Sequence, residues 1–289
     1  MKHFWVLFLV TISVFSQTKG IVKDSISGNV VPYVNIGVEG ENIATTSEEN
    51  GTFHLNKTGK GENLIFSAVG FKKKKVALKN AAIILLQPEE YQLEEVFVSN
   101  QKNTKELEIG DRKNSVLQAF DNGPKIDAKY FPYNTHYKKN RYIKAIRIRT
   151  DSQIDSALVK IKILAVDSDG FPGESMLKKD LLIRVKKGVV NQRISVADLH
   201  LVFPKKGIFI VFEKLLIEKN KIEKTIFDAN SQQSFTKTSY FPYLLYNLAE
   251  TDDAYTYFAG KWHNKNTEQK SNSEKNAVYE PAINLILSN

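Results

Sequence analysis

The sequence contains no cysteine in its 289 residues, so disulfide bonds, thiolate metal ligands and cysteine nucleophiles are all excluded. Long apolar runs are also scarce. The one clear run lies between Phe4 and Phe15, and it is shorter than the roughly 20 residues that a membrane-spanning helix needs. The folded part of the protein must therefore be stabilised by hydrophobic cores, and the chain is long enough to form two of them.

The N-terminus has the pattern of an export signal. Lys2 and His3 precede the apolar run, and small or tolerated residues lead up to Ser16, so residues 1–16 are predicted to be a signal peptide that is cleaved before Gln17. No later run could cross a membrane, and no thiol is present to carry a lipid. We expect an exported protein that resides in the periplasm, at the outer membrane or outside the cell.

The charge balance is a weak indicator of a partner. The formal charge of +9 becomes +8 when Lys2 leaves with the signal peptide. The densest basic run, residues 72–75, lies in an expected strand and hairpin, where lysines commonly protect an edge. Nucleic acid is not expected as a partner of an exported chain without a nucleic-acid-binding motif. An acidic polysaccharide or another anionic surface stays open as a partner.

Alternating apolar residues predict an all-β protein with two domains. In the first part, the alternation runs through Val34, Ile36 and Val38 and continues to Ile83 and Leu85. Residues 99–118 are polar and are predicted to be a linker. Residues 119–289 are predicted to form a second sandwich of the jelly-roll-like kind, and we expect the two parts to fold separately.

Four segments in the second part are predicted to be strands. In the run 159–165, every second residue from Val159 to Ala165 is apolar, and Lys160, Lys162 and Leu164 lie between them, which predicts one buried and one largely wet face. The run 208–212 is apolar throughout, which predicts a central strand. Further strands are expected at 199–203 and at 283–287, where the chain ends.

Residues 19–98 carry an ordered series of glycine, proline and apolar positions. The series consists of GIVKD at 20–24, VPYVNI at 31–36, TT at 45–46, NGTFHL at 50–55, IFSAVGF at 65–71 and LEEV at 93–96. In this order and spacing it resembles the carboxypeptidase regulatory-like domain. That resemblance implies a transthyretin-like Greek-key β-sandwich that serves as an accessory module on exported peptidases and on other surface proteins. It implies no peptidase activity, because the zinc ligands of such peptidases lie in a separate catalytic domain.

Motifs for catalysis are missing from the sequence. No histidine of the mature chain has the spacing of a zinc-peptidase motif, no Gly-x-Ser-x-Gly pentapeptide occurs, and GKG at 59–61 is interpreted as a turn. Asp167 and Asp169 precede Gly170 and could belong to a calcium loop with Glu174, but a hairpin turn explains the same residues. We therefore predict no catalytic residue, no metal ligand and no cofactor; whether Asp167 and Asp169 bind calcium is left open.

Aromatic residues are the remaining candidates for a site. Trp262, Tyr133 and Tyr243 lie in aromatic segments of the second domain, where rings can stack on sugars or pack the core. The sequence thus favours a non-catalytic cell-envelope protein with a binding or assembly role, whose partner is an unknown envelope protein or glycan. The alternatives are a carbohydrate-binding surface protein that acts through the second domain and, next, an unrecognised hydrolase whose paired carboxylates come together only in the fold.

Overall fold

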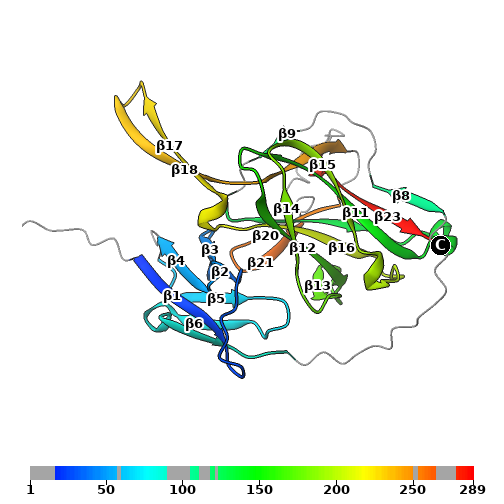
Figure 1. Ribbon diagram of the computed structural model, residues 1–289, viewed down its shortest axis with the longest axis horizontal. Helices are drawn as coiled ribbons and strands as arrows, with labels where there is room; N and C mark the ends of the chain where they lie inside the picture. Colours follow the sequence, from blue (N-terminus) through cyan, green and yellow to red (C-terminus); the bar gives the residue numbers. More distant parts are fainter. Residues whose placement is uncertain are drawn as a thin grey trace, which may run out of the picture.

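The computed structural model describes residues 17–56, 60–89, 105–110, 118–120, 123–249, 253–264 and 278–289. The predicted signal peptide and most of the predicted linker lie outside these residues. The described chain is all-β, as predicted, and forms two domains and a projecting hairpin (Figure 1). None of its helices is long and apolar enough to cross a membrane. The only helices in the described part are short 3₁₀ turns: η1 (Leu78–Asn80), η2 (Thr135–Lys139), η3 (Ala197–Leu199) and η4 (Glu218–Asn220).

The first domain is a sandwich of a three-stranded and a four-stranded sheet. The three-stranded sheet has the order β4 (Thr52–Asn56), β1 (Gln17–Asp24), β7 (Ile83–Leu86), with β1 and β7 parallel. The four-stranded sheet has the order β3 (Ala44–Thr46), β2 (Asn35–Val38), β5 (Asn63–Ser67), β6 (Lys74–Ala77). The core between them includes Val22, Val34, Ile36, Phe53, Leu55, Leu64, Phe66, Ile84 and Leu86. The predicted Asn-Gly turn places Gly51 at φ +77°, a conformation that favours glycine.

In strand β7, the apolar alternation of the sequence does not show which side chains are buried. Ile83 and Leu85 continue the apolar alternation of the sequence, yet they are 65% and 46% exposed. Their neighbours Ile84 and Leu86 are the residues that face the core. Because all four residues of this strand are apolar, the pattern cannot choose between its two faces.

The second domain consists of two seven-stranded sheets. The first has the order β13 (Pro172–Ser175), β12 (Ala157–Val166), β16 (Ile208–Lys214), β10 (Ile126–Phe131), β20 (Ala254–Phe258), β21 (Lys261–Asn264), and β14 (Leu181–Val185) also pairs with β12. The second has the order β22 (Val278–Pro281), β19 (Tyr243–Ala249), β11 (Tyr142–Ser152), β23 (Ile283–Ser288), β8 (Glu106–Ile109), with β15 (Gly188–Ser195) on β11 and β9 (Gln118–Ala119) on β19.

One core joins the two sheets face to face. It includes Ile143, Ile146 and Ile148 of β11, Val159, Ile161 and Ile163 of β12, Ile208, Ile210 and Phe212 of β16, and Ile283, Leu285 and Leu287 of β23. The predicted central strand is confirmed, because β16 lies between β12 and β10 and is buried on both faces. A buried ion pair also connects the sheets: Lys129 Nζ of β10 lies 2.6 Å from Glu280 Oε1 of β22, and both side chains are 3% exposed.

Two sequence predictions about the second domain need correction. The linker predicted at 99–118 contains strand β8, which pairs with β23 at the edge of the second sheet, so the domain begins before residue 119. The strand predicted at 199–203 is absent: the chain forms η3 there, followed by a single bridge between Val202 and Tyr142. His200 takes a positive φ of 50° after η3, which is incompatible with a continuous strand.

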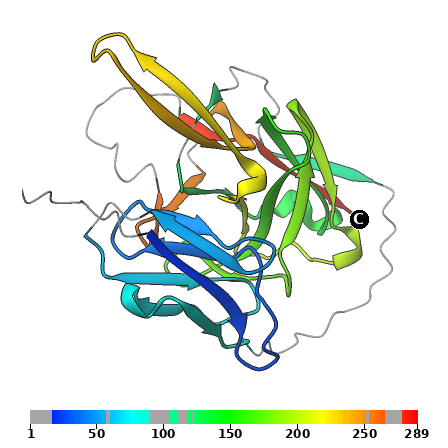
Figure 2. The same ribbon diagram turned by 60° about the vertical axis from the view of Figure 1, so that its left-hand side comes forward.

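The hairpin β17 (Lys221–Asp228) and β18 (Gln233–Tyr240) is an eight-pair antiparallel ladder that stands out from the body of the molecule (Figure 1). The second view shows the same projection (Figure 2). Most side chains of both strands are exposed. The hairpin is therefore the main departure from the compact two-domain arrangement.

Candidate functional site

The three aromatic residues predicted as ligand contacts lie in different settings. Trp262 lies on β21 and packs edge-to-face on Tyr257, with 5.3 Å between ring centroids, in an apolar layer on the outer face of the first sheet. Tyr133 follows β10 and packs against the main core together with Tyr137 and Phe203. Both residues thus contribute to packing.

Tyr243, the first residue of β19, borders a cavity. Its ring lies tilted on Phe241, with centroids 4.6 Å apart, and the Nζ atom of Lys214 lies 5.1 Å from the centre of the Tyr243 ring. Lys125 and Asp127 also line this cavity, whose volume of about 10 Å³ is close to the space of one water molecule. The cavity is thus lined by an aromatic ring, two lysines and one carboxylate.

Lys160 and Lys162, predicted on the wet face of β12, are buried. The side chain of Lys160 is 1% exposed and that of Lys162 is 13% exposed. Glu213 of β16, which is fully buried, lies 3.3 Å from Lys160 Nζ and 2.5 Å from Lys162 Nζ. Asp180 Oδ2 lies 3.3 Å from Lys160 Nζ. The prediction of a wet face is wrong because the first domain covers this part of the sheet.

The cover is formed by the loop before β2. Lys160 Nζ donates a hydrogen bond of 2.5 Å to the carbonyl oxygen of Tyr33, and Tyr33 packs with Leu158, Leu215 and Ile217. Tyr33 has a positive φ of 55°, which is rare for a residue with a bulky side chain. The strained conformation orients its carbonyl group toward the ammonium group of the other domain.

Two further hydrogen bonds connect the first domain to the second. The amide of Leu216 donates to Thr46 Oγ1 over 3.0 Å, and the amide of Glu218 donates to Glu48 Oε1 over 2.9 Å. Both acceptors lie on or just after β3 of the four-stranded sheet. The first domain is therefore attached to the second through this sheet and its loops.

The charges of this interface stabilise one another. Burial by itself would raise the pKa of Glu213, but the positive charges of Lys160 and Lys162 outweigh it and hold that pKa below its ordinary value. Burial acts to lower the pKa of Lys162, and the negative charges of Glu213 and Asp180 raise it above its ordinary value. Both pKa shifts favour the ionised forms of Glu213 and Lys162.

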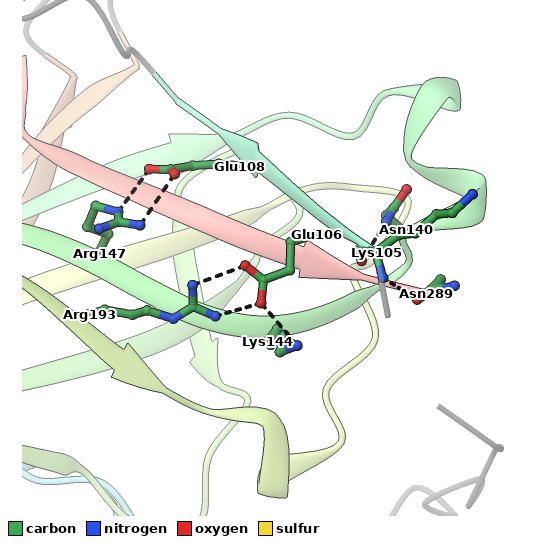
Figure 3. Close-up of polar contacts among 8 residues, drawn as sticks. All are labelled: Lys105, Glu106, Glu108, Asn140, Lys144, Arg147, Arg193 and Asn289. Carbon is green, nitrogen blue, oxygen red and sulfur yellow. Dashed lines mark hydrogen bonds and ion pairs between the residues drawn. The ribbon is translucent and has the colours of Figure 1, made fainter. Parts of the chain in front are cut away.

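A second polar cluster holds β8 on the edge of the second sheet (Figure 3). Glu106 accepts two hydrogen bonds from Arg193, of 2.9 and 3.1 Å, and lies 3.0 Å from Lys144 Nζ. The bonds from Arg193 and Lys144 lower the pKa of Glu106 to about 2. Glu108 pairs with Arg147 over 3.0 Å in the same way. Glu106 is 40% exposed, so these ion pairs add little to the free energy of unfolding. Their role is to orient β8 on the sheet.

The same strand is tied at its beginning to the end of the chain. The amide of Lys105 donates to Asn289 Oδ1 over 3.0 Å, and Asn140 Nδ2 donates to the carbonyl of Lys105 over 3.1 Å (Figure 3). Sequence reasoning missed β8 because its four residues, Glu-Leu-Glu-Ile, lie in a polar segment. The alternation of carboxylates and apolar residues within them was the signal that could have identified it.

The three-stranded sheet of the first domain has exposed apolar side chains along β7 on its outward face, beside polar residues of β1 and β4 such as Lys23 and His54. Ile83 and Leu85 project from β7, and Leu85 pairs with Lys23, which forms a bridge to Val30. Val30 is 41% exposed, so apolar surface extends across the sheet on either side of the Lys23 side chain. This face lies in the sheet that makes none of the interdomain hydrogen bonds described above.

The Asp167 turn has a structural explanation. Asp167 Oδ1 accepts hydrogen bonds of 2.9 and 2.8 Å from the amides of Asp169 and Phe171, and Gly170 has φ +85°. These contacts are those of a hairpin turn. Within the described ranges, no three histidine, aspartate or glutamate side chains form a group that could hold a metal ion.

The fold and these surfaces define an all-β protein in which an accessory-type sandwich is attached to a larger sandwich. Comparison with protein families identifies the smaller one: residues 18–98 match the CarboxypepD_reg-like domain, which confirms the resemblance seen in the sequence. Comparisons with curated proteins and with solved structures gave no match.

Proposed function

We propose that this protein is a non-catalytic, exported cell-envelope protein with a binding or assembly role. The observation that carries the proposal is the pair of exposed apolar side chains along β7 of the three-stranded sheet, with Ile83 65% and Leu85 46% exposed. Neighbouring exposed apolar side chains on a rigid sheet are typical of a surface that contacts another macromolecule. The partner is an envelope protein or glycan in the periplasm, at the outer membrane or outside the cell.

The mode of attachment supports this role. The four-stranded sheet and its loops bind the larger sandwich through Tyr33, Thr46 and Glu48, which leaves the other sheet of the accessory domain available. The hydrogen bond from the buried Lys160 to the Tyr33 carbonyl helps to hold the two domains in one orientation. A partner bound to β7 is thereby placed at a defined position relative to the second domain.

Cell fractionation tests the proposal. Replacing both Ile83 and Leu85 by lysine is expected to move the exported protein from the envelope fraction to the soluble exported fraction, with a loss of apparent affinity of at least about tenfold, or about 1.4 kcal/mol. The reason is that the charges make desolvation of the face unfavourable. The matched control is Val189→Lys on β15, which changes a similarly exposed apolar residue (68%) of the other domain. Equal fractionation of all three proteins, or retention of the unaltered chain in the cytoplasm, contradicts the proposal.

A carbohydrate-binding role is the second candidate, and the Tyr243 cavity favours it. A sugar could stack on the exposed part of the ring while a carboxylate of an acidic sugar pairs with Lys125 and Lys214. On an array of acidic and neutral glycans, Tyr243→Ala is expected to reduce binding to acidic glycans more than tenfold. Trp262→Ala and Tyr133→Ala are the controls and are expected to retain it, because both residues pack against other side chains. Absence of any glycan bound by the unaltered protein rejects this role.

A further inference from the structure

The hairpin β17–β18 is a sheet of two strands only. In the described part of the chain, no third strand pairs with either of its outer edges. Both figures of the whole molecule show it projecting from the body (Figures 1 and 2). A two-stranded hairpin is only marginally stable in water by itself, and an open edge eight residues long offers unpaired amide and carbonyl groups to another strand.

The distal half of the hairpin carries large apolar side chains. Ile226 is directly opposite Phe235 on one face, and these side chains are 37% and 52% exposed. Phe227 lies on the other face and is 64% exposed. The turn after β17 is closed by a hydrogen bond of 2.9 Å from the amide of Asn230 to Asp228 Oδ1. An open edge that carries large apolar side chains has the features of a strand-pairing surface.

The charges along the ladder point to the kind of partner. Lys224 is directly opposite Lys237, and like charges in this position are unfavourable. Lys224 Nζ donates a hydrogen bond of 3.0 Å to Gln153 Oε1, which satisfies one donor but neutralises no charge. Strand β18 contains Lys237 and no acidic residue, whereas β17 contains both lysines and carboxylates. Only β17 can therefore place opposite charges against each other when it pairs with an identical strand.

We propose that β17 pairs antiparallel with β17 of a second copy of this chain, with the two Ile226 residues facing each other on the twofold axis. In a symmetric antiparallel pair the axis is perpendicular to the sheet, so residues at equal distances from it face each other. With the axis at Ile226, Lys224 faces Asp228 of the second copy, and Asp228 faces its Lys224. Thr225 then faces Phe227.

This register produces a four-stranded sheet with complementary rows. One row contains Phe235 and Ile226 of one copy followed by Ile226 and Phe235 of the other, which buries a continuous apolar stripe. The adjacent row contains Lys237, Lys224 and Asp228 of the second copy. The carboxylate therefore lies beside Lys224 and offsets one of the two like charges.

Other axes on the distal half of β17 lack this complementarity. An axis at Lys224 places two lysines face to face. An axis at Thr225 places Ile222 opposite Asp228, and an axis at Phe227 places Ile226 opposite Asp228. The charge pattern of the strand thus selects one register.

The inference goes beyond the proposed function and does not depend on where the protein resides, so it is tested with the purified protein. Sedimentation velocity over a range of concentrations is expected to show a monomer–dimer equilibrium. Lys224→Asp and Asp228→Lys should each weaken dimerisation more than tenfold, because each places like charges opposite each other. The double variant that exchanges both charges should restore it. Lys237→Asp makes the same change in net charge on β18 and is expected to preserve the dimer.

The absence of cysteine allows a second, geometric measurement. Ile226→Cys is expected to form a covalent dimer on mild oxidation, because facing residues on the axis have Cβ atoms within disulfide reach. Thr238→Cys, an exposed position of β18, is the control and should remain monomeric after the same treatment. A monomer at all concentrations, unchanged dimerisation in the single charge variants, or failure of the exchanged variant to recover would each overturn the proposal.

Discussion

Glu213→Ala is expected to lower the free energy of unfolding by about 3–5 kcal/mol, a large part of the total stability of a protein of this kind. Glu213 is fully buried between Lys160 and Lys162. Removing the carboxylate leaves two ammonium groups with little access to water, opposed by Asp180 alone. The measurement is equilibrium unfolding in urea, followed by circular dichroism.

The pH dependence of stability gives an independent readout for Glu213. Its pKa is lower in the folded protein than in the unfolded chain, so its stabilising contribution is present above the ordinary value of 4.5 and is lost as the pH falls through the folded value. Glu213→Ala should remove this part of the acid-induced loss of stability. Glu213→Gln retains the shape of the side chain and provides a second variant if the alanine variant does not fold.

Glu106→Ala is the matched control for Glu213→Ala. Glu106 also pairs with two cations, but its side chain is 40% exposed, so its removal should cost no more than about 1 kcal/mol. Equal effects of the two alanine variants would show that the buried interface is not what makes Glu213 important.

Gly20→Ala is expected to destabilise the first domain by about 3 kcal/mol, near the upper end of overpacking effects. A Cβ atom at Gly20 would lie 2.1 Å from the carbonyl oxygen of Ala81 and 2.7 Å from the ring of Phe53. Neither neighbour is a flexible chain end: one is backbone and the other is a core ring that is 1% exposed. Strand β1 would have to move away from both.

Hydrogen exchange followed by mass spectrometry can detect this effect locally. Gly20→Ala should accelerate exchange in β1 and β4 and leave the strands of the second domain less affected. Gly37→Ala on β2 is the control, because a Cβ atom there meets nothing within 4 Å, and its exchange should match that of the unaltered protein. Unchanged exchange in Gly20→Ala would mean that the domain accommodates the methyl group without strain.

Much of the fold was predictable because its signals are local. Alternation identified most strands, and the uninterrupted apolar run at 208–212 correctly predicted the central strand β16. The glycine and proline series of the first domain identified its family. The three candidate aromatic residues were less informative, since a ring that packs a core and a ring that borders a cavity look the same in a sequence. Only the structure distinguished Tyr243 from Trp262 and Tyr133.

The sequence by itself determined the all-β class and the two sandwiches, because these follow from side-chain periodicity and from backbone requirements at turns. Its ordered series in residues 19–98 carried the resemblance to the family of the smaller sandwich. The tertiary structure alone decided which face of β7 is exposed, why Lys160 and Lys162 are buried, and where the hairpin β17–β18 projects. The physical reason is common to all three: burial depends on what covers a strand. That cover comes from residues far away in the chain, such as Tyr33 over Lys160. For the hairpin, the proposed cover is β17 of a second copy of the chain.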